Sequence, residues 1–198
     1  MLPLIKEQIS NSINTKTALL ADEELLKKIE LGAELILRAY KAGNKTLLAG
    51  NGGSAADAQH IAAEFVSRFY FHRPGLPSIA LSTDTSIITA IGNDYGFEHL
   101  FSRQIEAHAN NGDVFIGLST SGNSSNILNA LQICKNRGVK TIGLTGMAGS
   151  NMDSLCDICI KVPSLDTPRV QEAHILVGHI LCYLVEENLF GHLNPNKK

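Results

Sequence analysis

The segment DVFIGLSTSGNSSNIL, residues 113–128, decides the fold of this chain. Its first six residues are almost continuously apolar, which is typical of a strand buried on both faces of a parallel sheet. A polar loop follows at residues 119–124, and a helical pattern at residues 126–137 follows the loop. A buried strand that leads through a short loop into a helix is the repeating unit of an α/β protein.

The same unit recurs along the chain. Besides residues 113–118, apolar runs predict strands at 45–49, 77–82, 139–144 and 158–162. Helices are predicted at 54–70, 84–93, 97–109 and 126–137, and a last helix at 167–188 with Thr167 as its N-cap and Pro168 at its first position. We therefore expect a three-layer α/β sandwich, in which a five-stranded parallel sheet is covered by helices on both faces.

Two helices are predicted before the first strand, within residues 1–42. Asp22 is the predicted N-cap of the second helix, and Gly43 with Asn44 ends it. The two helices carry more apolar surface than one domain needs, so we expect them to contact another subunit. The chain then divides into a helical extension (1–43), an α/β domain (44–193) and a flexible tail (194–198).

Length and composition suit a single globular domain. The chain has 198 residues, of which 44% are hydrophobic and 18% charged, and its net charge is −2. This composition argues against disorder, and the charge gives no reason to expect a nucleic-acid partner. No apolar run approaches the ~20 residues that span a bilayer. Lys6 and Glu7 do not fit a secretory signal, so we expect a cytoplasmic protein without a membrane partner.

Hydroxyl groups crowd the loop at residues 119–124. Ser119, Thr120, Ser121 and Ser124 precede a helix whose N-terminus offers N–H groups and partial positive charge, and Gly122 lets the backbone approach a ligand closely. An ordinary capped turn would use the same residue types. We favour a phosphate site, held by neutral donors because the loop contains no Lys or Arg.

A second loop of this kind, GNGGS at residues 50–54, follows the strand at 45–49. It lacks the Gly-Lys-Ser/Thr ending of a nucleotide-binding loop, and its pattern is not G-x-G-x-x-G. A tight turn between a strand and a helix explains it equally well. Since parallel strands present their carboxyl ends at one edge of the sheet, both loops should face one crevice.

Groups suited to acid–base or metal chemistry lie on two of the predicted helices. His60 and Glu64 are four residues apart and share one helical face, where they can bind a metal together or act as an acid–base pair. A solvated helix face is the common alternative. On the last helix, Gln171 and His179 can line one side of a groove, although a histidine there is more often a satisfied core residue.

Four cysteines are present: Cys134, Cys156, Cys159 and Cys182. Cys156 and Cys159 form a lone C-x-x-C motif, and neither a second pair nor suitably spaced histidines complete a zinc site. The motif also precedes a predicted strand, whereas a redox motif would begin a helix after a strand. We interpret all four as free thiols.

Five motifs together resemble the phosphoheptose isomerases of the sugar isomerase (SIS) domain family. They are GNGGS (50–54), DAQHIAAE (57–64), GNDYGF (92–97), STSGNS (119–124) and RVQEAHILVGH (169–179). The loop at 119–124 marks the broad family, whereas His60, Glu64, Gln171 and His179 point to the heptose enzymes. The resemblance covers nearly the whole chain and implies the flavodoxin-like doubly wound SIS fold.

The resemblance implies conversion of D-sedoheptulose 7-phosphate to D-glycero-D-manno-heptose 7-phosphate through a cis-enediol, the first step toward ADP-heptose and the lipopolysaccharide core. It implies Glu64 and His179 as the catalytic acid–base pair, and one Zn²⁺ per subunit bound by His60, Glu64, Gln171 and His179. A homotetramer with active sites at subunit interfaces is also implied. The implied substrate-binding residues are Asn51, Gly52, Gly53, Ser54, Glu64, Asn93, Asp94, Ser119, Thr120, Ser121, Ser124 and Gln171.

Two rival interpretations stay open. A non-catalytic SIS domain that senses a phosphosugar or scaffolds a partner protein would keep the phosphate loop without needing Glu64 and His179. An isomerase of another ketose phosphate would share the loop and differ at the sugar end of the pocket. A glutamate that ligates zinc is also a poorer base, so the two implied roles of Glu64 are in tension.

Overall fold

The computed structural model describes residues 1–195 and 197. Within these residues, five parallel strands form one sheet in the order β2-β1-β3-β4-β5. The strands are β1 (Thr46–Ala49), β2 (Ser78–Ala80), β3 (Val114–Leu118), β4 (Lys140–Gly146) and β5 (Ile158–Val162). This is the strand order of a flavodoxin-like doubly wound sheet, so the predicted fold class is confirmed.

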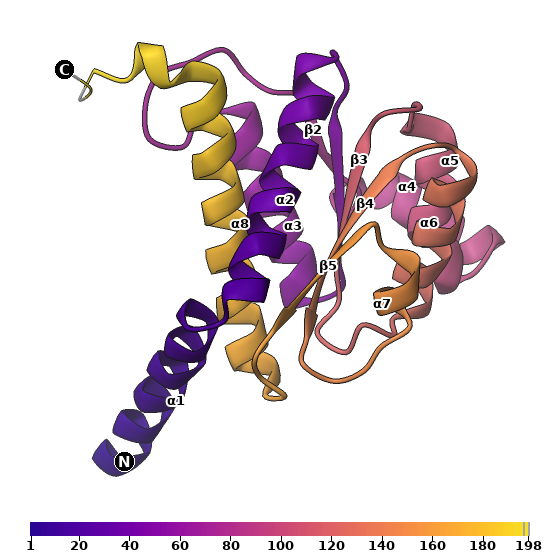
Figure 1. Cartoon of the computed structure of the whole chain (residues 1–198). Helices are drawn as coiled ribbons and strands as arrows, with labels where there is room; N and C mark the ends of the chain where they lie inside the picture. Colours follow the sequence, from indigo (N-terminus) through magenta and orange to yellow (C-terminus); the bar gives the residue numbers. More distant parts are fainter. Residues whose placement is uncertain (196, 198) are drawn as a thin grey trace.

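Helices cover both faces of the sheet (Figure 1). One face carries α2 (Glu23–Lys41), α3 (Gly53–Val66) and α8 (Thr167–Phe190). The other carries α4 (Thr85–Asp94), α5 (Leu100–His108), α6 (Ser125–Asn136) and α7 (Met152–Leu155). Successive strand residues point to opposite faces, so Ile116 packs into the core beneath α3 and α8 while its neighbour Phe115 packs into the core beneath α5 and α6.

The predicted helical extension, residues 1–43, contains α1 (Leu2–Leu20) and α2. Asp22 caps α2 as predicted, because its carboxylate accepts a hydrogen bond from the Leu25 N–H at 3.0 Å. α2 packs on the sheet, whereas α1 points away from the sandwich (Figure 1). Among the described residues, no helix is long and apolar enough to cross a bilayer. Of the tail predicted to be flexible, residues 196 and 198 lie outside the described residues.

Two predicted helix ends were wrong. α3 ends at Val66 and not near Tyr70, because the Arg73 guanidinium binds the carbonyl groups of its last turn. α8 has Asp166 as its N-cap in place of the predicted Thr167, which is already helical.

Two short elements also differ from the prediction. The helix predicted at 97–109 begins as a 3₁₀ turn, η1 (Phe97–His99), after Gly96 has turned the chain with φ of +94°. α7 was not predicted, because its four residues are too few to show a helical period.

Candidate functional site

The two polar loops lie side by side at the carboxyl edge of the sheet. β1 and β3 are paired neighbours, with Ala49 opposite Gly117, so the loops that follow them leave the sheet together. The side chains of Asn51 and Asn126 exchange two hydrogen bonds, of 3.0 and 2.9 Å. The first loop is therefore joined to the first turn of the helix that follows the second loop.

The hydroxyls of the second loop gather at the N-terminus of α6. The Oγ atoms of Ser119 and Ser124 are 2.9 Å apart, and those of Ser119 and Ser121 are 3.5 Å apart. Gly122 turns the loop with φ of +65°, and a side chain there would overlap Ser150. Rotatable hydroxyl donors beside a helix N-terminus suit a phosphate group.

A pocket of about 220 Å³ lies beside this loop. Thr120 and Ser121 line one side of it, and Leu165 and Val170 line another. The pocket reaches from the end of β3 to the start of α8, so a ligand anchored by the loop could extend toward α8.

Three side chains from two helices converge in a second cluster. His60 and Glu64 lie on α3, with His60 Nε2 3.2 Å from Glu64 Oε1. His179 comes from α8, and its Nε2 is 3.3 Å from His60 Nε2. The ligand atoms of the three residues all lie within 4.8 Å of one another. The pair at four-residue spacing is thus completed by a third group that is distant in sequence.

A close approach of α3 and α8 makes this convergence possible. Gly178, next to His179, faces Ile61, next to His60, and a Cβ on Gly178 would lie 2.7 Å from Ile61 Cγ1. Only a residue without a side chain lets the two helices come this close.

The donor set fits a divalent transition metal. Two imidazole nitrogens and a carboxylate oxygen are ligands of the kind that zinc takes. Two of the three separations, 3.2 and 3.3 Å, match the ~3.3 Å edge of a tetrahedron whose metal–ligand bonds are ~2.0–2.1 Å, while the third, between His179 and Glu64, is bounded only by the 4.8 Å span of the cluster and would shorten on metal binding. Two Nε2 atoms that face each other also need either a shared proton or a cation between them.

The environment of His179 keeps its imidazole neutral. The pKa of His179 lies below its ordinary value mainly because burial disfavours the charged form, and further because His60 lies beside it. The Glu64 carboxylate opposes the shift in part. A neutral imidazole can bind a metal or accept a proton at neutral pH.

Gln171 joins the loop at 50–54 to α8. Its amide lies against Gly53, where any side chain would overlap it. Gly52 precedes α3 with φ of +54°, and Ser54 is buried in the first turn of that helix. The absence of a side chain at Gly53 therefore lets the backbone of this loop lie close to the Gln171 amide.

Asn93 and Asp94 occupy the exposed end of α4. The Asn93 amide donates to Asp94 Oδ1 at 2.7 Å. In the described part of the chain, neither residue is hydrogen-bonded to the other predicted site residues, so the structure does not join this pair to the two loops or to the histidine cluster.

The four cysteines are free thiols, as interpreted from the sequence. Cys134 and Cys182 are buried, and Cys156 and Cys159 are half-buried. The pKa of Cys156 is raised, first by its hydrogen bond to Cys159 and then by burial, so it is held as an uncharged thiol.

Sequence analysis missed three residues that surround the cluster: Phe69, Arg73 and Glu186. The Phe69 ring lies 5.6 Å from the His179 ring, centre to centre. Arg73 and Glu186 form a buried ion pair at 3.1 Å beneath the last turn of α3. The sequence did contain one indication of the ion pair. Glu186 follows Gly178 and Cys182 at four-residue spacing, which places it on a buried face of α8. A buried carboxylate needs a charged or hydrogen-bonding partner.

Comparison with known proteins gives a consistent result. The SIS domain family matches residues 11–146. The chain is 67% identical over 186 residues to the phosphoheptose isomerase of Aneurinibacillus thermoaerophilus. The matched residues cover 94% of this chain and 94% of the relative. It is 64% identical over 187 residues to phosphoheptose isomerase 2 of Campylobacter jejuni, covering 94% of this chain and 93% of the relative.

Solved structures agree with these matches. The phosphoheptose isomerase of Neisseria gonorrhoeae has a TM-score of 0.88 at 40% identity, covering 94% of this chain and 98% of the other. That of Francisella tularensis has a TM-score of 0.90 at 35% identity, with the same coverage.

Proposed function

This chain belongs to the SIS domain family, and from that premise we propose that it isomerises D-sedoheptulose 7-phosphate to D-glycero-D-manno-heptose 7-phosphate. The observation that carries the proposal is the convergence of Glu64 with His60 and His179. Relatives named phosphoheptose isomerase match it along almost their whole length, which supports an isomerase that serves heptose biosynthesis.

The reaction moves a carbonyl from C2 to C1 of the sugar. A base must remove a proton from C1, which gives a cis-enediol, and a proton must then be delivered to C2. We assign the base to Glu64, because it is the carboxylate of the cluster. His179, held neutral by its surroundings, is suited to move a proton between the two oxygens.

The hydroxyl loop anchors the other end of the substrate. Ser119, Thr120, Ser121 and Ser124 would donate to the phosphate oxygens together with the N-terminus of α6. Asn51, Gly52, Gly53, Ser54, Asn93 and Asp94 stay predictions as residues that line the sugar.

We further propose one Zn²⁺ per subunit, held by His60, Glu64, Gln171 and His179. When bound, the ion would supply a Lewis acid that polarises the substrate carbonyl. Glu64 Oε1 faces His60, so we assign ligation to this atom and proton transfer to Oε2. This division leaves one oxygen of Glu64 free to take the proton, although the ion would still lower the basicity of the carboxylate.

The assembly is proposed to be a cytoplasmic homotetramer in which residues 1–43 contact neighbouring subunits and residues 44–193 form the catalytic domain. Leu4, Ile5, Ile9 and Ile13 of α1 are 64, 54, 56 and 58% exposed, which is unusual for apolar residues on one helix. A second subunit that covers them would explain this exposure.

The testing experiment is turnover of three ketose phosphates, sedoheptulose 7-phosphate, fructose 6-phosphate and ribulose 5-phosphate, followed by NMR of the products. We expect an aldose product from the heptulose, loss of activity after treatment with a chelator, and recovery with Zn²⁺. Preference for a shorter sugar would overturn the heptose assignment. Phosphosugar binding without turnover of any of the three would instead indicate a sensor or scaffold.

A further inference from the structure

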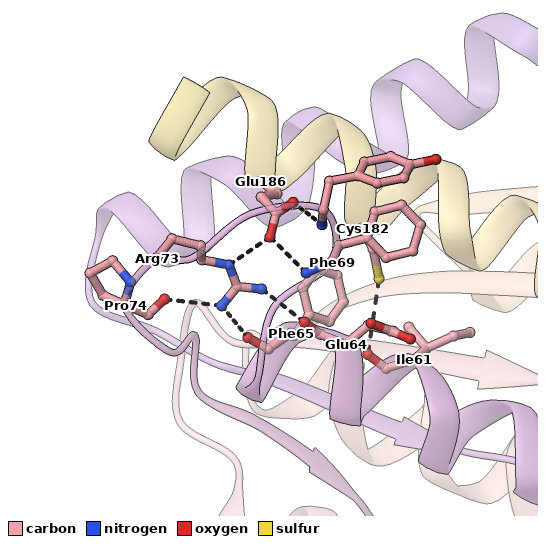
Figure 2. Close-up of polar contacts among 9 residues, drawn as sticks. Ile61, Glu64, Phe65, Phe69, Arg73, Pro74, Cys182 and Glu186 are labelled. Atoms are coloured by element: carbon pink, nitrogen blue, oxygen red, sulfur yellow. Dashed lines mark hydrogen bonds and ion pairs between the residues drawn. The ribbon is translucent and has the colours of Figure 1, made fainter. Parts of the chain in front are cut away.

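A buried ion pair links the segment after α3 to the last helix. Arg73 Nε donates to Glu186 Oε1 at 3.1 Å, and both side chains are 1% exposed (Figure 2). Glu186 also accepts hydrogen bonds from two backbone N–H groups, those of Phe69 at 2.7 Å and Tyr70 at 2.6 Å. Three donors therefore converge on one carboxylate.

The arginine end of this pair reaches the residue that we assign as the base. Arg73 Nη2 donates to the backbone carbonyl of Glu64 at 2.8 Å, and Nη1 donates to that of Phe65 at 2.6 Å and to that of Pro74 at 3.0 Å (Figure 2). Carbonyl groups at a helix C-terminus lack partners within the helix. The guanidinium supplies them here, and it thereby fixes the backbone from which the Glu64 side chain extends.

The glutamate end reaches the other catalytic group. By holding the Phe69 N–H, Glu186 keeps the Phe69 ring 5.6 Å from the imidazole of His179, with 42° between the two planes. Tyr70 packs in turn against Tyr183 of α8, with ring centres 5.5 Å apart. Glu186 itself follows His179 by seven residues, close to two helical turns, so both project from neighbouring parts of one face.

Stability alone is a weak explanation for this arrangement. Two charges taken out of water are expensive, and apolar residues of similar volume often stabilise a core as well or better. An ion pair does what apolar residues cannot, because its directed hydrogen bonds fix five backbone groups on one side of the cluster.

We propose that Arg73 and Glu186 are positioning residues that hold the segments carrying Glu64 and His179 in the arrangement from which these residues bind a metal and transfer a proton. The inference rests on the site assignment proposed above. Neither residue belongs to the cluster itself, and each acts on it through one backbone or ring contact.

Glu186→Gln tests the proposal, because an amide has one carbonyl oxygen to accept the three donors. Co²⁺ is the probe, and its affinity is measured from its visible absorption in competition with a chelator. We expect the affinity and kcat each to fall by ~10–100-fold, as for residues that orient metal ligands. KM for the phosphosugar should stay near the wild-type value, because the hydroxyl loop is untouched.

Asp113→Asn is the matched control. Asp113 is also a carboxylate with 1% exposure that accepts from two backbone N–H groups, those of Lys45 at 3.0 Å and Asn110 at 2.7 Å, and from the Lys45 ammonium at 2.6 Å. It lies at the opposite edge of the sheet, before β3. This variant should lose stability and keep its Co²⁺ affinity and kcat.

Arg73→Lys provides a second variant in case Glu186→Gln does not fold. An ammonium keeps the charge but cannot reach Glu186 and the two helix carbonyls at once, so the same split between kcat and KM is expected. Wild-type Co²⁺ affinity and kcat in either folded variant would overturn the proposal, as would an equal loss in Asp113→Asn. If the wild-type protein itself binds no Co²⁺ at the cluster, the site assignment fails instead.

Discussion

Gly178→Ala tests whether the separation of α3 and α8 controls the site. The new Cβ would overlap Ile61 Cδ1 and lie 2.7 Å from Cγ1, whereas ordinary contacts are 3.4–4 Å, so relief of the Cγ1 contact alone moves the helices apart by about 0.7 Å. Ile61 is 1% exposed and packs within the core beneath α3 and α8. The distance of 3.3 Å between the Nε2 atoms of His60 and His179 would grow toward about 4 Å, away from the ~3.3 Å edge of a tetrahedral zinc site.

We expect kcat of Gly178→Ala to fall by up to ~10²-fold, because a misplacement of this order has that effect on a catalytic geometry. Overpacking should cost about 1–3 kcal/mol, offset in part by the ~0.5–1 kcal/mol that alanine gains over glycine in a helix. Turnover of sedoheptulose 7-phosphate and the midpoint of urea unfolding measure the two effects.

Gly32→Ala is the control for this prediction. A Cβ on Gly32, where α2 meets α8, would lie 3.5 Å from Leu181 Cδ2 and 3.6 Å from Ile142 Cδ1, which are ordinary contacts. This variant should keep its kcat and gain stability. Ile61→Ala combined with Gly178→Ala should recover part of kcat, because it removes the overlapping atoms. Unchanged turnover in Gly178→Ala, or no recovery in the double variant, would refute the reasoning.

Three further predictions concern single residues. Glu64→Gln should lower kcat by ~10²-fold or more with phosphosugar binding largely kept, measured by turnover and calorimetry, and near wild-type turnover would exclude Glu64 as the base. Ser124→Ala should raise KM more than it lowers kcat, because it removes one phosphate donor that now lies 2.9 Å from Ser119 Oγ; an unchanged KM would argue against the phosphate loop. Burial lowers the pKa of His174 to about 4 from 6.5, so the unfolded chain binds the extra proton. The contribution of His174, which is buried in α8, to the free energy of unfolding should be fully present above pH 6.5 and fall by about 3 kcal/mol toward pH 4. Urea unfolding of His174→Leu at the same pH values should not show this loss.

The sheet and its loops could be predicted because their signals are local. Residues 114–118 contain no polar side chain, and the loop that follows carries its own turn residues. The parallel arrangement then placed the loops at 50–54 and 119–124 at one edge. Boundaries that depend on distant partners could not be predicted in this way. α3 ends at Val66 because Arg73 binds the carbonyl groups of its last turn. No residue pattern within 54–70 predicts that contact.

The candidate site likewise contains one part that the local sequence predicts and one part that depends on distant packing. The shared face of His60 and Glu64 follows from their spacing alone. That His179 completes the cluster depends on how α8 packs on α3, and the spacing of Gln171 and His179 along α8 does not specify it. Resemblance supplied this grouping, and the structure supplies its cause, which is the close contact at Gly178.

The hydroxyl loop has a consequence for how the substrate finds its place. Ser119, Ser121 and Ser124 act over hydrogen-bond distance, and the loop has no charged side chain whose field would extend into solution. A phosphate bound by these neutral hydroxyls is not attracted over long range by a charged side chain of the loop. Added salt therefore has little electrostatic attraction between the loop and the phosphate to screen. The loop's share of affinity should therefore vary little with ionic strength. Selection would rest on the shape of the phosphate terminus and the reach of the sugar behind it.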